Sequence, residues 1–334
     1  MAKAFENSLD TNNFTIFDSY AKAVSVLSRS ATPVCSISGG SDSDIVLDII
    51  HNVDEDRKVQ YYWLDTGLEY QATKEHLNFL ENKYGIEIER VRACKPIPTC
   101  CREYGVPFLS KYVSEQIMRL QLHGFQWEDE PLPELLAKYP NCKIALQWWC
   151  NAYYAPESGV VQMSRFSISR NKWLKEFLIA NPPDFKISNK CCEYAKKKPA
   201  KLFIKEHFAD LDIIGVRKAE GGIRSSAYKT CFSESKTQGY NSYRPVFWYT
   251  DKDKKIYEDF YGIQHSRCYT EYGLKRTGCV GCPYNPKVTQ ELDIIKRHEP
   301  KLYTAAQNIF KDSYEYTRKY RAFQKTMKKK NTAS

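Results

Sequence analysis

The sequence predicts an α/β protein with a doubly wound, mostly parallel sheet. Short apolar runs typical of buried strands alternate along the chain with longer segments in which apolar residues recur at helical spacing. Two glycines, Gly39 and Gly40, lie directly after the first such run and directly before a helical segment. With 334 residues, 42% of them apolar, the chain has room for one large domain with an insertion or for two ordinary domains.

The predicted elements follow in chain order. Apolar residues at helical spacing between Phe17 and Leu27 indicate an opening amphipathic helix. The elements predicted after it are a strand at 34–37, a helix from Ser43, strands at 59–64 and 86–91 on either side of a helix at 71–83, and a strand at 212–216. Because a strand followed by a helix and a parallel strand is the repeating unit of doubly wound sheets, this order supports the fold class.

Composition divides the chain into three parts. We expect a nucleotide domain at 1–124 and 185–270, a helical insertion at 125–184, and a cysteine knuckle with a helical region at 271–334. The insertion is rich in aromatic residues, which we interpret as core rather than as a base-stacking surface, because aromatic side chains dominate cores. They are Trp127, Trp148, Trp149, Tyr153, Tyr154 and Trp173.

The net charge and the cysteines restrict the partners. Fifty basic and forty acidic residues give a formal charge of +10, which suits an anionic partner such as a nucleotide or nucleic acid but also fits a solvated basic surface. No stretch approaches the ~20 apolar residues that a membrane span needs, and the first residues hold no apolar signal core, so we expect a cytoplasmic protein. Twelve cysteines in such a chain indicate thiol chemistry or metal ligation rather than disulfides.

The run Ser38-Gly39-Gly40-Ser41-Asp42-Ser43 is typical of a phosphate-binding loop. Two glycines between a strand and a helix let successive backbone N–H groups converge on one point, with the positive end of the helix dipole behind them. The three serine hydroxyls can add donors. Asp42 would repel a bare phosphate, so we expect it to hold the loop through backbone bonds or to reach a Mg²⁺ ion. The alternative is an ordinary turn, since turns are rich in serine and glycine.

The loop resembles that of the phosphoadenosine phosphosulfate reductase family, within the wider group of PP-loop ATP pyrophosphatases, the adenine nucleotide alpha-hydrolase superfamily. Further stretches agree in order: Leu64–Gly67, Pro107–Lys111, and Ile214–Arg217 with Glu220 and Arg224. The resemblance covers residues 30–120 and 185–285. It implies a Rossmann-like fold in which ATP or a related adenine nucleotide is bound at the loop, with Asp65, Thr66, Gly67 and Gly215 beside it.

Charged residues in the matching stretches are candidates for the chemistry. Lys111, Arg217 and Arg224 can bind phosphate or sulfate oxygens, and guanidinium offers a planar fork of donors. Taken singly, each also fits a plain surface charge. We predict catalytic roles for Asp42, Arg217 and Arg224. Many relatives carry lysine where this chain has Ser41, so one charged phosphate contact is absent from the loop itself.

Four cysteines form a candidate metal site. Cys191 and Cys192 are adjacent, and Cys279 and Cys282 form a Cys-x-x-Cys knuckle. Four thiolates select zinc or an iron-sulfur cluster, and the adjacent pair favours iron-sulfur because structural zinc sites space their ligands more widely. The arrangement resembles the 4Fe-4S pattern of bacterial sulfonucleotide reductases, which implies these four as ligands. Zinc and plain structural thiols remain alternatives, and Cys268 could replace one ligand.

A second adjacent pair, Cys100-Cys101, has no matching knuckle. We interpret it as partly buried thiols, with a redox pair or a sulfur carrier as the alternative if it lies at the pocket. Cys35 lies in a predicted strand and is expected in the core.

Two enzymatic functions and one binding function fit these features. ATP-dependent adenylation followed by sulfur transfer to a nucleic acid or small molecule would use the loop, Mg²⁺, the cluster and a sulfur donor such as a cysteine desulfurase. Reduction of a sulfonucleotide to sulfite requires, in the family, a cysteine in a Glu-Cys-Gly motif near the C-terminus, and no cysteine follows Cys282 here. We therefore expect adenylation. The third possibility is a zinc-stapled module that binds nucleotide or nucleic acid without catalysis.

Overall fold

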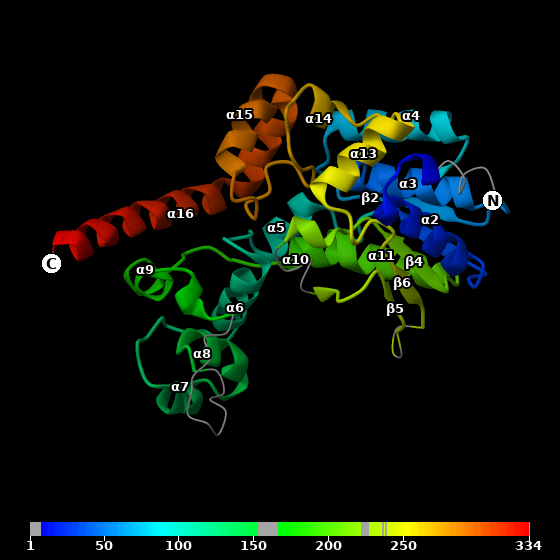
Figure 1. The fold of residues 1–334 in the computed structure, drawn as a ribbon. Helices are drawn as coiled ribbons and strands as arrows, with labels where there is room; N and C mark the ends of the chain where they lie inside the picture. The colour runs from blue at the N-terminus through cyan, green and yellow to red at the C-terminus, as the bar shows by residue number, and fades with distance from the viewer. Residues whose placement is uncertain (1–7, 153–165, 222–226, 236, 238, 334) are drawn as a thin grey trace. The chain divides into compact units, whose positions relative to one another are not determined.

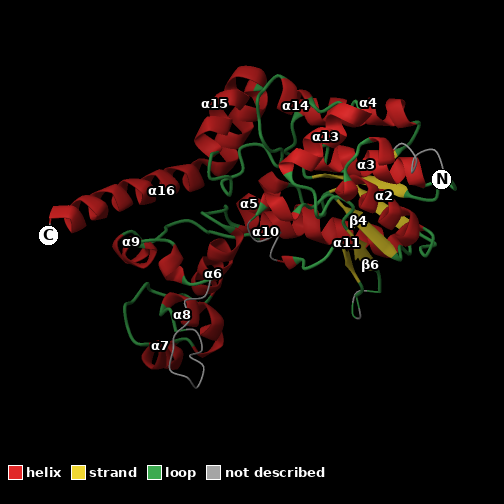
Figure 2. Ribbon diagram, in the orientation of Figure 1, coloured by secondary structure: helices red, strands yellow, loops and turns green. Residues whose placement is uncertain are grey.

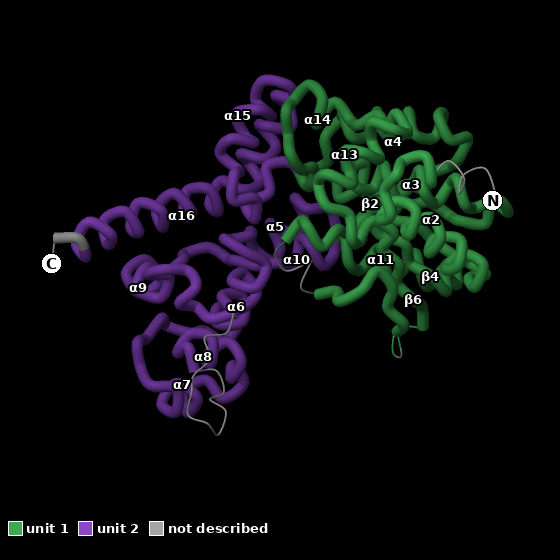
Figure 3. Tube along the Cα trace, viewed as in Figure 1, with its two compact units in different colours: residues 1–94, 195–279 green, residues 95–194, 280–334 purple. Residues whose placement is uncertain are grey.

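The chain forms two compact units, shown in green and purple in Figure 3. The computed structural model describes residues 8–152, 166–221, 227–235, 237 and 239–333. Unit 1 comprises Met1–Cys94 and Ala195–Cys279, and unit 2 comprises Lys95–Tyr194 and Val280–Ser334. Residues 95–124 and 185–194, which the sequence assigned to the nucleotide domain, thus fall in unit 2, because their helices pack with one another and with the helices of the insertion and the C-terminal region.

A six-stranded sheet forms the centre of unit 1, coloured yellow in Figure 2. Its spatial order is β3-β2-β1-β4-β6-β5. All neighbouring pairs are parallel except β5 with β6. The strands are β1 (Pro33–Ser36), β2 (Gln60–Asp65), β3 (Ile88–Arg92), β4 (Leu211–Ile214), β5 (Phe232–Ser233) and β6 (Asn241–Tyr243).

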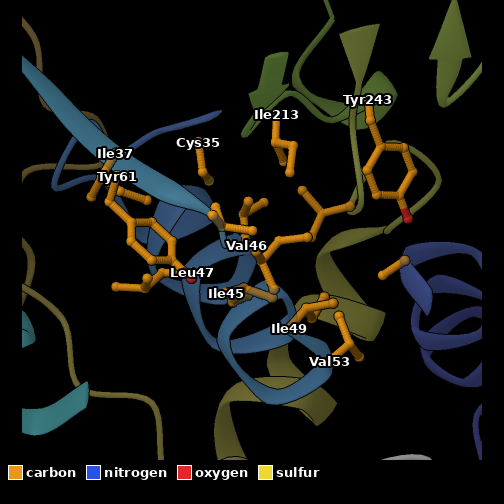
Figure 4. Close-up of a cluster of buried hydrophobic side chains, with 14 of the residues drawn as sticks. Cys35, Ile37, Ile45, Val46, Leu47, Ile49, Val53, Tyr61, Ile213 and Tyr243 are labelled. Carbon is orange, nitrogen blue, oxygen red and sulfur yellow. The ribbon is translucent and has the colours of Figure 1, made fainter. Parts of the chain in front are cut away.

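Helices cover both faces of this sheet (Figure 1). On one face Cys35 packs with apolar side chains of α2, α3 and α13, and Figure 4 shows Val46 and Ile49 of α3 in the same cluster as Cys35 and Ile213. On the other face Tyr62 packs against Phe203 of α11. The helices of unit 1 are α2 (Phe14–Leu27), α3 (Ser41–Val53), α4 (Gln71–Tyr84), α11 (Lys198–Glu206), α13 (Asp251–Tyr261) and α14 (Arg267–Thr270).

The predicted α/β fold with a doubly wound, mostly parallel sheet is therefore confirmed. The predicted strands and helices of unit 1 agree with β1 to β4 and α2 to α4 to within three residues at each end. The short strands β5 and β6 were not predicted. Their sequences, Phe232–Ser233 and Asn241–Tyr243, are too short and too polar to form an apolar run.

Unit 2 is helical in the part that the structure describes, apart from turns and a single β-bridge. Trp148 and Trp149 are fully buried in its core and Trp127 is nearly so, which confirms the interpretation of these aromatics, whereas Trp173 is half-buried. Tyr153 and Tyr154 lie outside the described residues. The helices are α5 (Ile97–Tyr104), α6 (Lys111–Leu122), α7 (Leu132–Lys138), α8 (Lys143–Trp149), α9 (Leu174–Ala180), α10 (Lys190–Cys192), α15 (Val288–His298) and α16 (Pro300–Ala333).

The long C-terminal helix α16 completes the core of unit 2. Its Tyr316 and Tyr320 pack against Phe177 of α9, with ring centroids 4.9 and 5.1 Å away. Phe310 interrupts the helical backbone of α16 with φ −110° and ψ 15°. Among the helices that the structure describes, none combines the length and the apolar character needed to span a bilayer.

Candidate functional site

Three loops that carry predicted site residues meet at one edge of the sheet in unit 1. They follow β1, β2 and β4, which are parallel neighbours with Ser36 in register with both Tyr62 and Ile214. The strand order runs outward from β1 in both directions, to β2 and β3 on one side and to β4 and β6 on the other. Crevices outside the carboxyl ends of strands at such a reversal are the usual ligand sites of open α/β sheets.

Glycine is required in the loop after β1. Gly39 has φ +66°, a left-handed conformation that side chains disfavour, and a Cβ there would lie 2.7 Å from Cγ2 of Thr73. Gly40 is extended and caps α3, with its carbonyl accepting hydrogen bonds from the N–H groups of Ser43 at 2.9 Å and Asp44 at 3.1 Å. The predicted turn from strand to helix at Gly39-Gly40 is thus present.

The hydroxyls of Ser38 and Ser43 bind the loop itself. Ser43 Oγ accepts from the Gly40 N–H at 3.1 Å and donates to the Gly40 carbonyl at 2.8 Å. Ser38 Oγ donates to Ser43 Oγ at 3.1 Å. The N–H of Ser41 donates to the hydroxyl of Tyr269 from α14, a residue that the sequence did not single out. A phosphate that binds at this end of α3 would therefore have to displace the Tyr269 hydroxyl from the Ser41 N–H.

Gly215, at the end of β4, lies directly against the loop. A Cβ on this residue would be 3.3 Å from both the nitrogen and the Cα of Ser43, so any side chain would press on the backbone at the start of α3. Its predicted place beside the loop agrees with this geometry, and its contribution is the absence of a side chain.

Asp42 is held by two cations, one of which the sequence did not indicate. Its Oδ1 accepts from Arg217 Nε at 2.9 Å and from Lys254 Nζ of α13 at 2.7 Å. Burial alone would raise the pKa of Asp42, but the charges of Lys254 and Arg217, together with hydrogen bonds, hold it below its usual value. The side chain of Asp42 thus anchors the loop through these cations rather than through backbone bonds.

Lys254 also donates to Ser41 Oγ, so an ammonium group reaches the loop from another helix. This is the position at which many relatives carry lysine. In the sequence Lys254 stands in the charged run Lys252-Asp253-Lys254-Lys255, where nothing distinguishes it from its neighbours. Only the helical geometry of α13 separates the inward-facing Lys254, 14% exposed, from Lys255, 69% exposed.

A buried charge network lies behind the loop. His265 lies between Asp44 Oδ2, 2.7 Å from its Nδ1, and Glu258 Oε1, 2.9 Å from its Nε2. His76 Nε2 is 3.1 Å from the other oxygen of Asp44. Burial lowers the pKa of His265, but the hydrogen bonds to the two carboxylates outweigh it and raise the pKa to about 9. His265 is therefore charged at neutral pH and fixes the first turn of α3 to α13.

The residues after β2 shape their own loop. Asp65 Oδ1 accepts from the N–H of Gly67 at 2.9 Å. Thr66 is fully buried and its hydroxyl donates to Glu69 Oε1 at 2.6 Å, with Cys279 Sγ 3.7 Å away. These side chains thus position the backbone at the same sheet edge as the phosphate loop.

Two predicted phosphate partners lie outside the described residues of unit 1. Lys111 is the first residue of α6 and belongs to unit 2. Arg224 lies outside the described residues. Within the described residues of unit 1, the predicted basic ligand Arg217 bonds to the phosphate loop through Asp42.

The predicted metal ligands are divided between the units. Cys191 and Cys192 on α10 and Cys282 lie in unit 2, whereas Cys279 is the last residue of unit 1. Hydrogen bonding to Cys101, burial and the charge of Cys282 raise the pKa of Cys191. Within the described ranges, no group of three or more histidine, cysteine or acidic side chains has an arrangement that could hold a metal ion.

The remaining cysteines have separate surroundings. Cys268, suggested as a replacement ligand, is buried on α14 of unit 1, with its sulfur 3.7 Å from Thr73 Oγ1. Cys35 is fully buried in the sheet core, as predicted. Cys100 and Cys101 are buried on α5.

Comparison with known proteins gives similarities at several levels. An uncharacterized protein of Methanocaldococcus jannaschii is 22% identical over 282 residues, which cover 84% of this chain and 42% of that protein. The chain therefore spans about two fifths of the length of this relative. Residues 32–113, which include the phosphate loop, β2 and β3, match the sequence model of the phosphoadenosine phosphosulfate reductase domain.

Two solved structures show a distant likeness at 12% identity. Phosphoadenylyl-sulfate (PAPS) reductase from Candida auris, in a phosphate complex, aligns with a TM-score of 0.42 over 78% of this chain and 87% of that chain. The U34-tRNA thiolase NcsA from Methanococcus maripaludis, with its 4Fe-4S cluster, aligns with a TM-score of 0.37 over 92% and 78%. The family whose sequence model matches residues 32–113 is the one that the loop sequence resembles.

Proposed function

We propose that the chain is an enzyme that binds ATP at the phosphate loop of unit 1 and uses it to adenylate a substrate, which then receives sulfur. The observation that carries this proposal is the turn at Gly39 and Gly40 between β1 and α3, with Arg217 and Lys254 converging on Asp42 beside it. Backbone N–H groups at a helix end and two neighbouring cations are the features that bind phosphate groups in proteins.

The charges at the loop suit a displacement at the α-phosphate. Arg217 and Lys254 share one carboxylate in this structure, so either cation can turn part of its hydrogen bonding to a phosphate oxygen without leaving Asp42 uncompensated. In the adenylation step an oxygen of the substrate attacks the α-phosphorus and pyrophosphate leaves. The two cations, with Mg²⁺ held by the phosphates, would stabilise the negative charge that develops on the departing oxygens.

A 4Fe-4S cluster is the second part of the proposal, with Cys191, Cys192, Cys279 and Cys282 as its ligands. An all-thiolate donor set is the one that iron-sulfur clusters and structural zinc select, so the chemistry of these residues fits either group. When bound, the cluster would hold the incoming sulfur. The residues themselves contribute burial: Cys191 is 5% exposed, so water has little access to it.

The net charge of the chain bears on the sulfur acceptor, and sulfur transfer also requires a donor. A formal charge of +10 supports a nucleic acid as acceptor, since lysine and arginine neutralise phosphates, although a small molecule would serve the same reaction. A cysteine desulfurase would supply the sulfur. We propose the cytoplasm as the compartment, where reduced thiols persist.

Reduction of a sulfonucleotide is the second candidate. The match of residues 32–113 to the phosphoadenosine phosphosulfate reductase domain favours it. In that reaction the same loop would hold the phosphate end of the sulfonucleotide, and sulfite would be the product.

A nucleotide panel tests the proposal. The affinities of the full chain for ATP, adenosine phosphosulfate and its 3′-phosphorylated form are measured by calorimetry, and pyrophosphate and sulfite release are assayed in parallel. We expect micromolar ATP binding and substrate-dependent pyrophosphate release. Sulfite release with a thiol reductant would establish the reductase instead, and nucleotide binding without either product would indicate a binding module.

A further inference from the structure

The last part of helix α16 is basic and carries no acidic residue. Between Tyr316 and Ala333 the sequence has seven lysine and arginine residues and neither aspartate nor glutamate. All seven are exposed: Arg318, Lys319, Arg321, Lys325, Lys328, Lys329 and Lys330. The earlier part of the same helix is mixed in charge, with Lys311 beside Asp312 and Glu315. The positive charge of the last part is therefore not balanced within its own segment.

Five of these residues form one stripe along the helix, which we call the basic stripe. It consists of Arg318, Arg321, Lys325, Lys328 and Lys329. Because they recur three or four residues apart, an α-helix of 3.6 residues per turn places them on one face. Like charges at this spacing repel one another and destabilise a helix. Alternating signs are typical of a helix face that is merely solvated, so a uniform stripe favours an anionic partner.

The opposite face of this segment is fixed to the rest of unit 2. Three aromatic side chains of α16 pack around the ring of Phe177 on α9, with centroids 4.9, 5.1 and 5.6 Å away. They are Tyr316, Tyr320 and Phe323. Each is two positions from a residue of the basic stripe, about 200° around an α-helix. The core of unit 2 thus holds the helix by one face and leaves the basic stripe on the other.

Basic residues of neighbouring segments lie beside this helix. Lys172 contacts it through its carbonyl, which accepts from the Tyr320 hydroxyl at 2.8 Å, and its side chain is exposed. Arg321 Nη2 donates to a carbonyl 3.3 Å away, that of the residue before the exposed Lys287. Burial and the charge of Glu176 on α9 raise the pKa of Tyr320, so an acidic side chain also lies in this region. A partner at this surface would nevertheless meet mainly positive charge.

We propose that the basic stripe binds the phosphate backbone of a nucleic acid. The inference rests on the proposed function for its role, because it names the surface that holds a nucleic-acid acceptor. Lysine and arginine neutralise backbone phosphates and supply affinity without reading the base sequence. An anionic membrane suits the segment less well. Helices that lie on a bilayer insert an apolar face, and the apolar face of this segment is already packed in the core of unit 2.

The test measures binding of the full chain to labelled single-stranded RNA by fluorescence anisotropy over a series of salt concentrations. The RNA has about 20 nucleotides, which exceeds a typical single-strand site. A DNA duplex of similar length is measured in parallel, because backbone contacts do not depend on sequence. The stripe variant combines Arg321→Gln, Lys325→Gln and Lys328→Gln. The control variant removes the same charge from three exposed lysines on separate segments, by Lys143→Gln, Lys205→Gln and Lys229→Gln.

We expect the stripe variant to bind RNA about tenfold more weakly or worse, with a shallower dependence of log K on log salt. Each phosphate contact with a single strand contributes about 0.7 to that slope, so three lost contacts should reduce it by about 2. The control variant should match the wild type. A variant that keeps the charges, Arg321→Lys with Lys325→Arg and Lys328→Arg, should also bind like the wild type, which separates lost charge from a disturbed helix.

The outcomes separate this inference from the proposed function. Equal affinity and slope in the stripe and control variants would overturn the inference, as would a wild-type protein that binds phosphatidylserine vesicles but no nucleic acid. If ATP releases pyrophosphate with a small-molecule acceptor and the protein binds no nucleic acid, adenylation stands and the inference is wrong. If the basic stripe binds nucleic acid but ATP releases no pyrophosphate with any acceptor, the binding surface stands and adenylation is wrong.

Discussion

The phosphate loop and the cysteine region are built by different means. The loop takes its shape from its backbone: Gly39 supplies the left-handed residue, and Gly40 and Ser43 bond to one another. The cysteine region takes its shape from two packed helices, α5 with Cys100-Cys101 and α10 with Cys191-Cys192. A site made of backbone is preorganised by its own segment, whereas a site made of thiols from distant segments depends on packing and on the group that it binds.

The largest expected effect concerns the thiol site. Cys191→Ala removes a buried proposed ligand, so we expect the cluster to be lost almost completely while ATP affinity stays at the wild-type value. The readouts are iron per chain and calorimetry. Cys94→Ala, at an exposed cysteine, is the control and should retain the iron. Equal iron in both variants would show that Cys191 is not a ligand.

A bulky residue in the loop should have the converse effect. In Gly40→Leu the new Cβ would lie 3.1 Å from Ser38 Oγ and 3.2 Å from the Tyr269 hydroxyl. Overpacking of this kind costs roughly 1–3 kcal/mol, so we expect ATP binding about 100-fold weaker with the iron content unchanged. Gly278→Leu is the control for nucleotide binding, because a Cβ at Gly278 meets nothing within 4 Å. If Gly40→Leu binds ATP with the wild-type affinity, the loop is not part of the nucleotide site.

A smaller effect is expected from Lys254→Met. One charge-assisted hydrogen bond contributes about 1.5 kcal/mol, so ATP affinity should fall roughly tenfold. Lys255→Met is the matched control, because Lys255 is exposed on the same helix and pairs with Asp259 at 2.6 Å. If Lys254 only anchors Asp42, the variant will unfold at a lower temperature but bind ATP normally, so thermal unfolding is measured beside affinity.

The smallest effect concerns stability rather than ligands. Because the pKa of His265 is raised to about 9, its ion pairs with Asp44 and Glu258 stabilise the fold fully below the unfolded pKa of about 6.5. This stability is lost as the pH rises through about 9, and at 1.36 kcal/mol per pKa unit it amounts to roughly 3 kcal/mol at most. Urea unfolding at about pH 6 and pH 10 should show the loss in the wild type. In His265→Gln the part of the pH dependence that comes from His265 should be absent. If both proteins lose the same free energy of unfolding between the two pH values, the assignment to His265 is contradicted.

Sequence patterns were sufficient where neighbouring residues determine structure. The apolar runs of β1 and β2 and the glycines at 39 and 40 were enough to predict the sheet and the turn, because strand burial and left-handed φ values are local properties. Residues 95–124 fall in unit 2, whereas the sequence assigned them to the nucleotide domain. Sequence patterns do not show which helices pack together, and this packing defines the units.

The partners of the loop could not be predicted in the same way. Lys254 is more than 200 residues from Ser41, and His265 more than 200 from Asp44. Tyr269, which accepts the Ser41 N–H, is likewise distant in sequence. No periodicity marks any of the three, because only the folded arrangement of α13, α14 and the segment between them brings these residues to the start of α3.

The close fit of Gly215 against Ser43 has a mechanical consequence. With 3.3 Å between the position of a Cβ and the backbone of α3, the end of β4 packs directly against the first turn of that helix, so we expect the two to shift together. A small displacement of the loop on ligand binding would carry Arg217, two residues further along, with it. Amide protons in the two segments should therefore slow their hydrogen exchange together when nucleotide binds, as parts of one cooperative element.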